Sequence, residues 1–277
     1  MKGSAGMEKR IKKQMVNRSK KGKKRLLLWA ALAALFMMGC GNSGASTEQT
    51  EQTEQTEHME DTAVQNTTEA AETTSDLTAA KVGSLITFGH YEQDNDTSNG
   101  KEPIEWIVLE KREDGSLVVM SRYALDVHPY HSDRKSVSWR TCTLRKWLNT
   151  TFLNSAFSSS ELAVISTENS SNADNASYRA EDRVFLFTIL EARGYFAGGS
   201  DGDPVSGTCK PTDYVKAKGI WTVEGGEFGG NCRWWLRSPG DDATNAAYVG
   251  FNGQVYNLGR TVNRDDTAIR PALVLKP

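Results

Sequence analysis

The stretch CRWWLRSPG (residues 232–240) decides how the C-terminal third of the chain folds. Side chains of a β-strand point alternately to its two faces, so Trp234 and Leu236 share one face while Trp235 and Arg237 share the other. One of these faces belongs to the core. The other is expected to line a groove, where an indole ring and a guanidinium suit a stacked sugar or a carboxylate.

A second interpretation of Arg237 stays open. Its guanidinium could pair inside the protein with an acid such as Glu191, and so organise the core without binding any ligand. Arg270, which precedes Pro271 in IRPALVLK (269–276), has the same two interpretations. The sequence therefore predicts two arginines that are either ligand-binding or structural.

Working outward from this stretch, strand patterns occur at both ends of the region. The C-terminal third predicts further short strands in AAYVGFNGQVYN (246–257) and IRPALVLK (269–276). Near the other end, IEWIVLEKR (104–112) and SLVVMSRYALD (116–126) flank a Glu-Asp-Gly turn, which predicts a β-hairpin. SLITFGHY (84–91) alternates like another strand.

Helical patterns lie between these strands. TLRKWLNTTFLNSAF (143–157) has one apolar stripe, formed by Leu144, Trp147, Leu148 and Phe152. VFLFTILEARGYF (184–196) starts like a strand and continues as a helix. Strands at both ends with helices between them predict an α+β fold, since no βαβ alternation is present. Residues 81–277 are about 200 in number, which is ample for one domain with one core.

Several phrases resemble an uncharacterised family of bacterial domains of unknown function. The resemblance spans about Phe88 to Lys276, and no reaction is implied by it. The phrases that carry it are IEWIVL, WRTCTLRKWLNTTFLNSAFS, VFLFTILEARGYF, CKPTDYVKAKG, CRWWLRSPG and IRPALVLK.

The last third also resembles the C-type-lectin-like fold in its broad bacterial sense. The order of features carries this resemblance: Trp235-Leu236-Arg237-Ser238, then Ala246-Ala247-Tyr248-Val249, then Gly253, and finally Ile269-Arg270-Pro271. Relatives of that fold include glycan binders, protein-binding receptors and formylglycine-generating enzymes. The likeness is one of fold and implies no single function.

The resemblance to lectin-like domains also directs attention to the loop after CRWWLRSPG. Asp241, Asp242 and Asn245 form an oxygen-rich group there, and lectin-like domains hold Ca²⁺ in loops of this region. We expect these residues, together with Trp235, Arg237 and Tyr248, to form the ligand-binding surface, with Ca²⁺ as the one cofactor considered. A metal site built from other residues is not expected.

The loop between the first two predicted strands also has spaced oxygen side chains. Asp94, Asp96 and Ser98 precede Glu105 in a pattern similar to a calcium-binding EF-hand. Its glycine, however, falls one position late and no helix precedes it, so an ordinary hairpin loop is the better interpretation. His128 and His131 are interpreted as ordinary loop histidines, because a zinc site needs three or four ligands.

Three cysteines remain for the folded region. Cys209 and Cys232 flank the loop that leads into the Trp-rich strand, and we expect them to form a disulfide bond in an exported protein. Cys142 heads the predicted helix and is expected to be buried. A thiol site of the formylglycine-generating type needs two closely spaced cysteines near the C-terminus, and the sequence has none. The common motifs of hydrolases, metalloproteases and nucleotide-binding enzymes are absent as well.

The N-terminus has the pattern of a lipoprotein signal peptide (1–39). Eleven basic residues and one acid precede the apolar run LLLWAALAALFMM (26–38), which is too short to cross a bilayer and is followed by Gly39 and Cys40. Cleavage would leave Cys40 to be lipidated and to hold the protein at the membrane. Met37 replaces the usual leucine, and an uncleaved signal anchor is the alternative. Translation can begin at Met1, Met7 or Met15.

The segment 40–80 is expected to be a disordered linker. Its Glu-Gln-Thr repeats lack large apolar side chains and carry many acids with no Lys or Arg before Lys81. The whole chain has 33 basic and 35 acidic residues, and loss of residues 1–39 removes 11 and 1 of them, leaving 22 and 34. A mature protein this acidic is not expected to bind nucleic acid.

These features together predict a lipid-anchored domain on the extracytoplasmic face of the cell membrane. Its expected function is to bind a glycan, a cell-wall component or a surface protein. Two alternatives stay open: a cell-envelope enzyme, either a hydrolase or a formylglycine-generating-type oxidase, and a structural or assembly lipoprotein.

Overall fold

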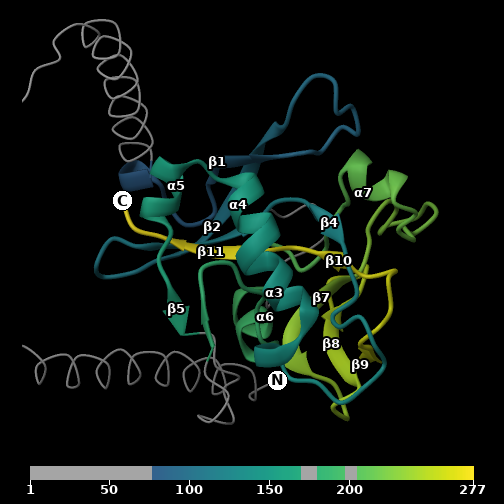
Figure 1. Cartoon of the computed structure of the whole chain (residues 1–277). Helices are drawn as coiled ribbons and strands as arrows, with labels where there is room; N and C mark the ends of the chain where they lie inside the picture. Colours follow the sequence, from purple (N-terminus) through teal and green to yellow (C-terminus); the bar gives the residue numbers. More distant parts are fainter. Residues whose placement is uncertain (1–76, 170–179, 197–204) are drawn as a thin grey trace, which may run out of the picture. The chain divides into compact units, whose positions relative to one another are not determined.

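The computed structural model describes residues 77–169, 180–196 and 205–277 (Figure 1). Two main sheets organise these residues, with the strand orders β1-β2-β3-β11 and β4-β10-β7-β8-β9, and β5 and β6 form a separate ladder. Short helices occur between the strands, so the predicted α+β class is confirmed. The predicted signal peptide, Cys40 and the linker up to residue 76 lie outside the described residues.

The first sheet joins the two ends of the described chain. Its strands are β1 (Leu85–Tyr91), β2 (Glu102–Lys111), β3 (Leu117–Ser121) and β11 (Ala272–Leu275). β2 and β3 form the hairpin predicted from the Glu-Asp-Gly turn, and Asp114 closes that turn by accepting a hydrogen bond of 2.6 Å from the Ser116 hydroxyl. β11 pairs antiparallel with the other side of β3. The last strand of the chain therefore completes a sheet whose other strands precede residue 122.

The second sheet contains the Trp-rich stretch as its central strand. Its strands are β4 (Asp126–Val127), β10 (Ala268–Ile269), β7 (Trp234–Pro239), β8 (Asn245–Val249) and β9 (Val255–Thr261). The sequence predicts one strand over 269–276, but the structure divides this segment between β10 and β11 at Arg270 and Pro271. Proline has no N–H for a ladder, and the Arg270 guanidinium turns inward to donate to the Ser121 carbonyl at 2.9 Å.

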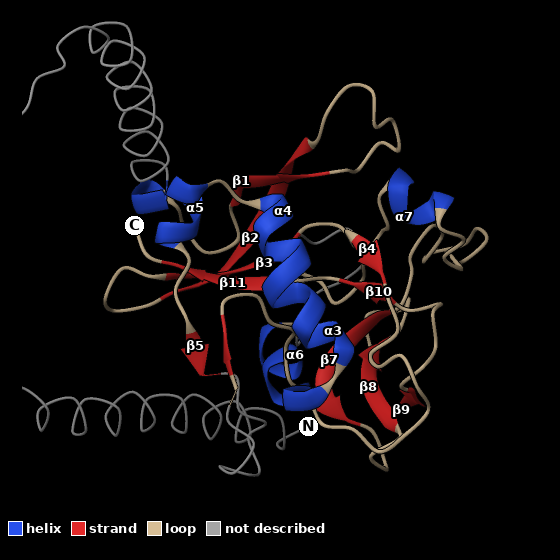
Figure 2. Cartoon of the chain, in the orientation of Figure 1, coloured by secondary structure: helices blue, strands red, loops and turns tan. Residues whose placement is uncertain are grey.

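The predicted central helix is confirmed from Thr143 to Ala156, and it crosses in front of the sheets in Figure 2. Its stripe residues Leu144, Leu148 and Phe152 are buried. The helical elements are η2 (Trp139–Thr141), α3 (Thr143–Trp147), the π-helical turn η3 (Leu148–Phe152), α4 (Leu153–Ala156), α5 (Ser159–Val164), α6 (Ile189–Tyr195) and α7 (Asp213–Ala217), and the small ladder pairs β5 (Glu168–Asn169) with β6 (Glu181–Asp182).

The segment 184–196 is only partly as predicted. Its helical second half is confirmed as α6, which begins after the Thr188 cap with a reciprocal bond from Glu191. Its first half is extended but makes a single bridge, between Phe185 and Ala272, rather than a strand. The extended part packs into the core because all of residues 184–187 are apolar and buried.

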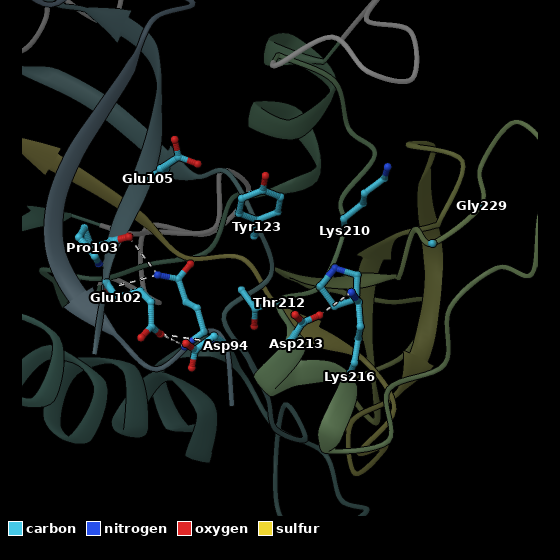
Figure 3. A pocket seen from close by; sticks show the side chains of 13 residues that line it. Asp94, Glu102, Pro103, Glu105, Tyr123, Lys210, Thr212, Asp213, Lys216 and Gly229 are labelled. Atoms are coloured by element: carbon cyan, nitrogen blue, oxygen red, sulfur yellow. Dashed lines mark hydrogen bonds and ion pairs between the residues drawn. The ribbon is translucent and has the colours of Figure 1, made fainter. Parts of the chain in front are cut away.

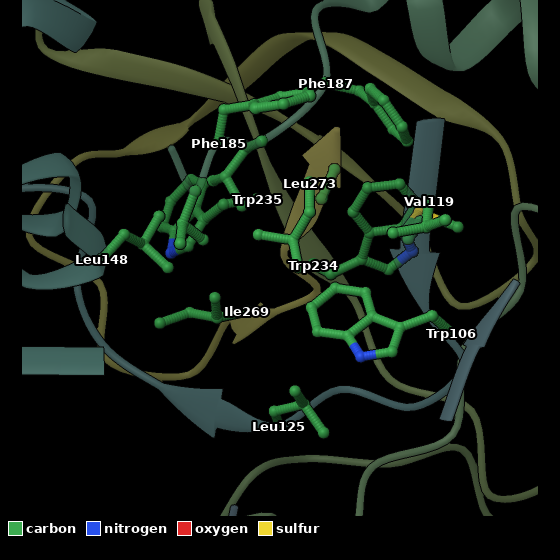
Figure 4. Packing of buried hydrophobic residues seen from close by; sticks show 14 of the residues in the cluster. Trp106, Val119, Leu125, Leu148, Phe185, Phe187, Trp234, Trp235, Ile269 and Leu273 are labelled. Atoms are coloured by element: carbon green, nitrogen blue, oxygen red, sulfur yellow. The ribbon is translucent and has the colours of Figure 1, made fainter. Parts of the chain in front are cut away.

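One core serves both sheets. Figure 4 shows three indoles in it, Trp106 from β2 and Trp234 and Trp235 from β7, gathered around Leu273 of β11. Each of these indoles donates its N–H to a backbone carbonyl, so large rings are buried without an unpaired polar atom. The core therefore holds β7 and β11 in fixed positions.

The packed chain begins earlier than the predicted boundary at residue 81. Leu77 is 1% exposed, Ala80 is buried, and the Lys111 ammonium donates to the Thr78 carbonyl at 2.7 Å. Residues 77–80 therefore belong to the domain and not to the linker. Within residues 77–169, 180–196 and 205–277, no helix is both long and apolar enough to cross a membrane.

Candidate functional site

The predicted groove beside Trp235 and Arg237 does not form. Trp235 is 0% exposed and packs on Tyr130 with 5.9 Å between ring centroids, and Arg237 is 4% exposed. The prediction assumed that one face of β7 meets solvent. β7 is instead the middle strand of five, and both of its faces are covered, so alternation along it does not separate core from surface.

The alternative interpretation of Arg237 is confirmed. Its guanidinium pairs with the Glu191 carboxylate at 3.0 Å and also donates to the Leu186 carbonyl. Its guanidinium carbon Cζ lies 5.5 Å from the centre of the Phe185 ring. Arg270 is likewise internal, donating to backbone carbonyls of Ser121 and other buried residues. Both arginines organise the core.

The remaining C-terminal candidates form a turn and part of a sheet surface. The Asp242 carboxylate accepts the Thr244 N–H at 2.6 Å and its hydroxyl at 2.7 Å, while Asp241 accepts the Asn245 amide at 2.7 Å. These bonds close the turn between β7 and β8 and engage one carboxylate oxygen of each aspartate that was expected to hold Ca²⁺. Tyr248 is half-buried on β8, and its ring stacks on that of Tyr256 from β9.

A different site is hollowed at the surface, and its volume is about 600 Å³. Figure 3 shows its two walls. Asp94 from the β1–β2 loop and Glu102 at the start of β2 lie on one side, and Lys210 and Lys216 lie on the other. Tyr123, which follows β3, stands between the walls. The pocket therefore presents carboxylates opposite ammonium groups across an aromatic ring.

The acidic wall is built around Glu102. Its carboxylate accepts the backbone N–H groups of Gln93 at 2.5 Å and Asp94 at 3.2 Å, which fixes the loop that the sequence predicted to be an ordinary hairpin connection. Oxygens of Glu92, Asp94 and Glu102 lie within 4.8 Å of one another. Three carboxylates at this separation offer ligand atoms suited to Ca²⁺, so these residues could hold a cation at the edge of the pocket.

Two neighbouring carboxyl groups at the acidic wall, those of Glu92 and Asp94, have pKa values shifted in opposite directions. Partial burial, together with the nearby Glu102 charge, raises the pKa of Glu92, and one Glu92 oxygen has no hydrogen-bond partner among the described residues. The hydrogen bond from the Asn99 amide lowers the pKa of Asp94. Asp94 is thus held as an anion that faces the pocket.

The basic wall is fixed by backbone pairing. Ala124 forms a parallel bridge with Pro211, and the Ala124 N–H donates to the Lys210 carbonyl at 3.0 Å. Thr212 caps α7 by accepting the Val215 N–H at 3.3 Å. The two walls are joined directly as well, because the Tyr214 N–H donates to the Gln93 carbonyl at 2.9 Å.

Asp126 connects the elements behind the pocket. Its carboxylate accepts the Tyr91 hydroxyl of β1 at 2.6 Å and the Lys218 ammonium, just after α7, at 2.5 Å. Burial by itself would raise the pKa of Asp126, but hydrogen bonds from His128, Lys218 and Tyr91 outweigh it, and the pKa is lowered. Burial would lower the pKa of Lys218, but its bonds to Asp126 and Tyr214 raise it. The ion pair thus holds the end of α7 against β4, and the Tyr91 hydroxyl joins β1 to the same carboxylate.

The three cysteines of the described chain are all buried. Cys142 caps α3, as its predicted position implies, and burial raises the pKa of its thiol to about 12, so it is chemically inert. Cys209 and Cys232 lie side by side as thiols: the Cys232 N–H donates to the Cys209 carbonyl at 2.8 Å. Burial raises the pKa of Cys209, but the hydrogen bond from Cys232 and the charge of Arg270 outweigh it and lower this pKa.

We therefore keep the predicted disulfide bond as an expected result for protein exposed to an oxidising compartment. Disulfide exchange with a cellular oxidoreductase would join Cys209 to Cys232, lowering the intact mass by about 2 Da. Mass spectrometry after alkylation in denaturant, without reductant, should then find Cys142 as the only alkylated thiol of these three. Alkylation of all three cysteines in protein recovered from the cell envelope would contradict the pairing.

Sequence reasoning missed the pocket because its walls come from three distant segments. No motif joins Glu102, Tyr123 and Lys216, which only the fold brings together. One local signal was present in CKPTDYVKAKG (209–219), where Pro211 and Thr212 mark a helix start and lysines cluster around it. That signal predicts α7 but not what α7 faces.

Comparison with known proteins gives one match. The model of a family described as a domain of unknown function, DUF6273, matches residues 114–277, which is more than half of the chain. The predicted resemblance to a family of domains of unknown function is thereby confirmed over these residues. No curated protein and no solved structure matches. Tyr123 and the basic wall of the pocket fall within the matched residues, and the acidic wall precedes them.

Proposed function

This chain belongs to the DUF6273 family, and we propose that it is a binding module for cell-wall glycopeptides, held by lipidated Cys40 on the extracytoplasmic face of the cell membrane. The observation that carries the proposal is the pocket with opposed charges. The basic N-terminus, the short apolar run and Cys40 support the anchor. The order of β7, β8 and the final strands supports a C-type-lectin-like fold for the domain.

The chemistry of the two walls favours a ligand that carries both charges. Lys210 suits a carboxylate, since Lys216 already pairs with Asp213 at 2.7 Å, while Asp94 and Glu102 suit an amine or a row of hydroxyl groups. Tyr123 offers a ring on which a sugar can stack. A short peptide attached to a sugar has all three of these groups, whereas a neutral polysaccharide lacks the carboxylate.

The pocket is supported by a rigid frame, which favours binding. The Asp126 ion pair and the bond from Tyr214 to Gln93 fix both walls, so little side-chain ordering remains to be done when a ligand binds. A pocket of about 600 Å³ is within the usual range for small-molecule sites.

The same site offers less support to a hydrolase. A general acid needs a carboxyl group that stays protonated near neutral pH, whereas the pKa of Asp94 is lowered, and Glu92, whose pKa is raised, is not among the residues that line the pocket. Glu105 is engaged by Arg122 at 2.9 Å. The Cys209 and Cys232 thiols are buried, which disfavours an oxidase that must bring a thiol to its substrate.

Reversing one charge of the basic wall is expected to abolish most of the binding. Lys210 is exposed, so Lys210→Glu should fold normally and repel the ligand carboxylate, with an affinity loss of about tenfold or more. The measurement is calorimetric titration of the detergent-solubilised full chain with purified muropeptides at low salt.

A matched control is available in Lys135→Glu. Lys135 is also an exposed lysine, paired with Asp133 at 3.1 Å, and it does not line the pocket. Its affinity should equal that of the wild type. Equal affinities for all three proteins, or no binding of muropeptides by the wild type, would rule out the pocket as the site.

A further inference from the structure

The outer strands of the second sheet and the loops beside them form a second unusual surface, which shares no residue with the pocket. Its arginine and aromatic side chains are Trp221, Arg233, Tyr248, Tyr256, Arg260 and Arg264, and we call them the arginine–tyrosine face. β9 is the edge strand of its sheet, so this face lies at the rim of the fold (Figure 1).

Aromatic rings form the flat part of the face. Tyr248 and Tyr256 are opposite each other on β8 and β9, and their rings stack with centroids 4.9 Å apart and planes 5° apart. Tyr256 is exposed, and Trp221 is 46% exposed. Because solvent reaches these rings, they offer the apolar planes on which sugar rings stack.

Guanidinium groups lie over the same rings. The Arg260 guanidinium is 5.6 Å from the centre of the Tyr248 ring, and the Arg233 guanidinium is 4.9 Å from that of Trp221. Burial lowers the pKa of Arg233, the charges of Arg260 and Arg264 lower it further, and those of Asp266 and Tyr248 oppose them, as expected for charged groups that lie close together.

One carboxylate offsets these three cations. Asp266 accepts two bonds from Arg260, at 2.8 and 2.7 Å, and one from Arg264 at 3.1 Å. None of the described residues forms a hydrogen bond with the Arg233 guanidinium, and the buried Nε of Arg260 has no partner among them either. The face therefore keeps an excess of positive charge in an otherwise acidic protein, and the accessible unused donors are those of Arg233.

We propose that the arginine–tyrosine face binds an acidic glycan whose sugar rings carry carboxylates. The sugar rings would stack on Tyr256 and Trp221, and a ligand carboxylate would accept hydrogen bonds from the Arg233 guanidinium. Arg260 and Arg264 already donate to one planar carboxylate, that of Asp266, which is an example of the contact proposed for the ligand. This proposal does not depend on the pocket, since the two sites share no residue.

The test uses the detergent-solubilised full chain and polygalacturonate as the probe. The wild type is expected to bind polygalacturonate and not its methyl-esterified form, which has the same rings without the charge. Arg233→Gln should weaken binding about tenfold and reduce its salt dependence, and Tyr256→Ala should weaken it about fivefold. Both side chains reach solvent, so neither change should unfold the domain.

Arg193→Gln is the matched control, because Arg193 is an exposed arginine on α6 that is not part of the face. It should bind as the wild type does, and so should Lys210→Glu from the pocket. The proposal is overturned if Arg233→Gln binds normally, or if the methyl-esterified polymer binds equally well. It is also overturned if a polymer of glycerol phosphate binds more tightly than polygalacturonate, which would identify a phosphate site.

Discussion

Replacing Asp126 with asparagine is expected to lower the free energy of unfolding by about 3 kcal/mol. The Asp126 side chain is 2% exposed. One of its oxygens accepts a hydrogen bond from the Tyr91 hydroxyl, and the other pairs with the Lys218 ammonium. Removing the charge leaves the Lys218 ammonium without its anion in a half-buried position. Because the Lys218 side chain is 33% exposed and partly hydrated, the loss falls at the lower end of the range for broken buried pairs.

The pH dependence of this loss has a defined sign. Folding lowers the pKa of Asp126, so its contribution is complete above the ordinary value of about 3.9 and disappears as the pH falls through the lower folded value. Folding raises the pKa of Lys218, so its contribution is complete below about 10.4 and disappears as the pH rises through the folded value. The difference between wild type and Asp126→Asn should therefore be greatest between these limits.

Urea denaturation across a pH series measures both effects, and Asp133→Asn is the control. Asp133 is an exposed aspartate paired with Lys135, so its loss should change stability by less than about 0.5 kcal/mol at any pH. If Asp126→Asn proved as stable as the control near neutral pH, the ion pair would not be what holds α7 against β4.

Replacing Arg270 with methionine is expected to have a larger effect, about 4 kcal/mol or more, which lowers Tm by about 10 °C or prevents folding. Arg270 is buried where the chain passes from β10 to β11. Its guanidinium donates to the carbonyls of Ser121, Ser206 and Thr208, at distances from 2.9 to 3.3 Å. Methionine fills similar space but leaves these buried acceptors unpaired.

The aromatic neighbours of Arg270 add to this loss. Its guanidinium lies 5.4 Å from the centre of the Trp234 ring and 5.9 Å from that of Phe196, contacts that strengthen when water is excluded. Thermal unfolding followed by circular dichroism measures the change. Arg112→Met is the control, because Arg112 pairs at the surface with Glu168 at 3.2 Å, and it should lower Tm by no more than about 2 °C. Similar Tm values for the two variants would contradict the structural role of Arg270.

Much of the fold could be predicted because local patterns agree with it. The Glu-Asp-Gly turn between 104–112 and 116–126 specifies the β2–β3 hairpin, and the stripe from Leu144 to Phe152 specifies the central helix. What local patterns do not contain is pairing across long separations. The partner of β3 is β11, and the sequence of neither strand indicates that the two pair. The division of 269–276 at Arg270 also depends on where its guanidinium finds acceptors.

The candidate site was harder to predict for a related reason. Alternation along β7 suggested an exposed Trp235, but exposure depends on what covers the strand, and Tyr130 comes from a different part of the chain. Only the pairing of Arg237 with Glu191 could be anticipated, as one of two alternatives. The pocket and the arginine–tyrosine face are both assembled from distant segments, whose charges have no pattern in the sequence.

The pairing of β11 with β3 also sets the order of events when the protein is made. β3 ends at Ser121, and its partner does not leave the ribosome until residue 275 has been added. For the exported lipoprotein that we propose, the chain would cross the secretion channel unfolded, before β11 can pair with β3. The domain would close only on the far side of the membrane, so slow folding would serve delivery instead of hindering it.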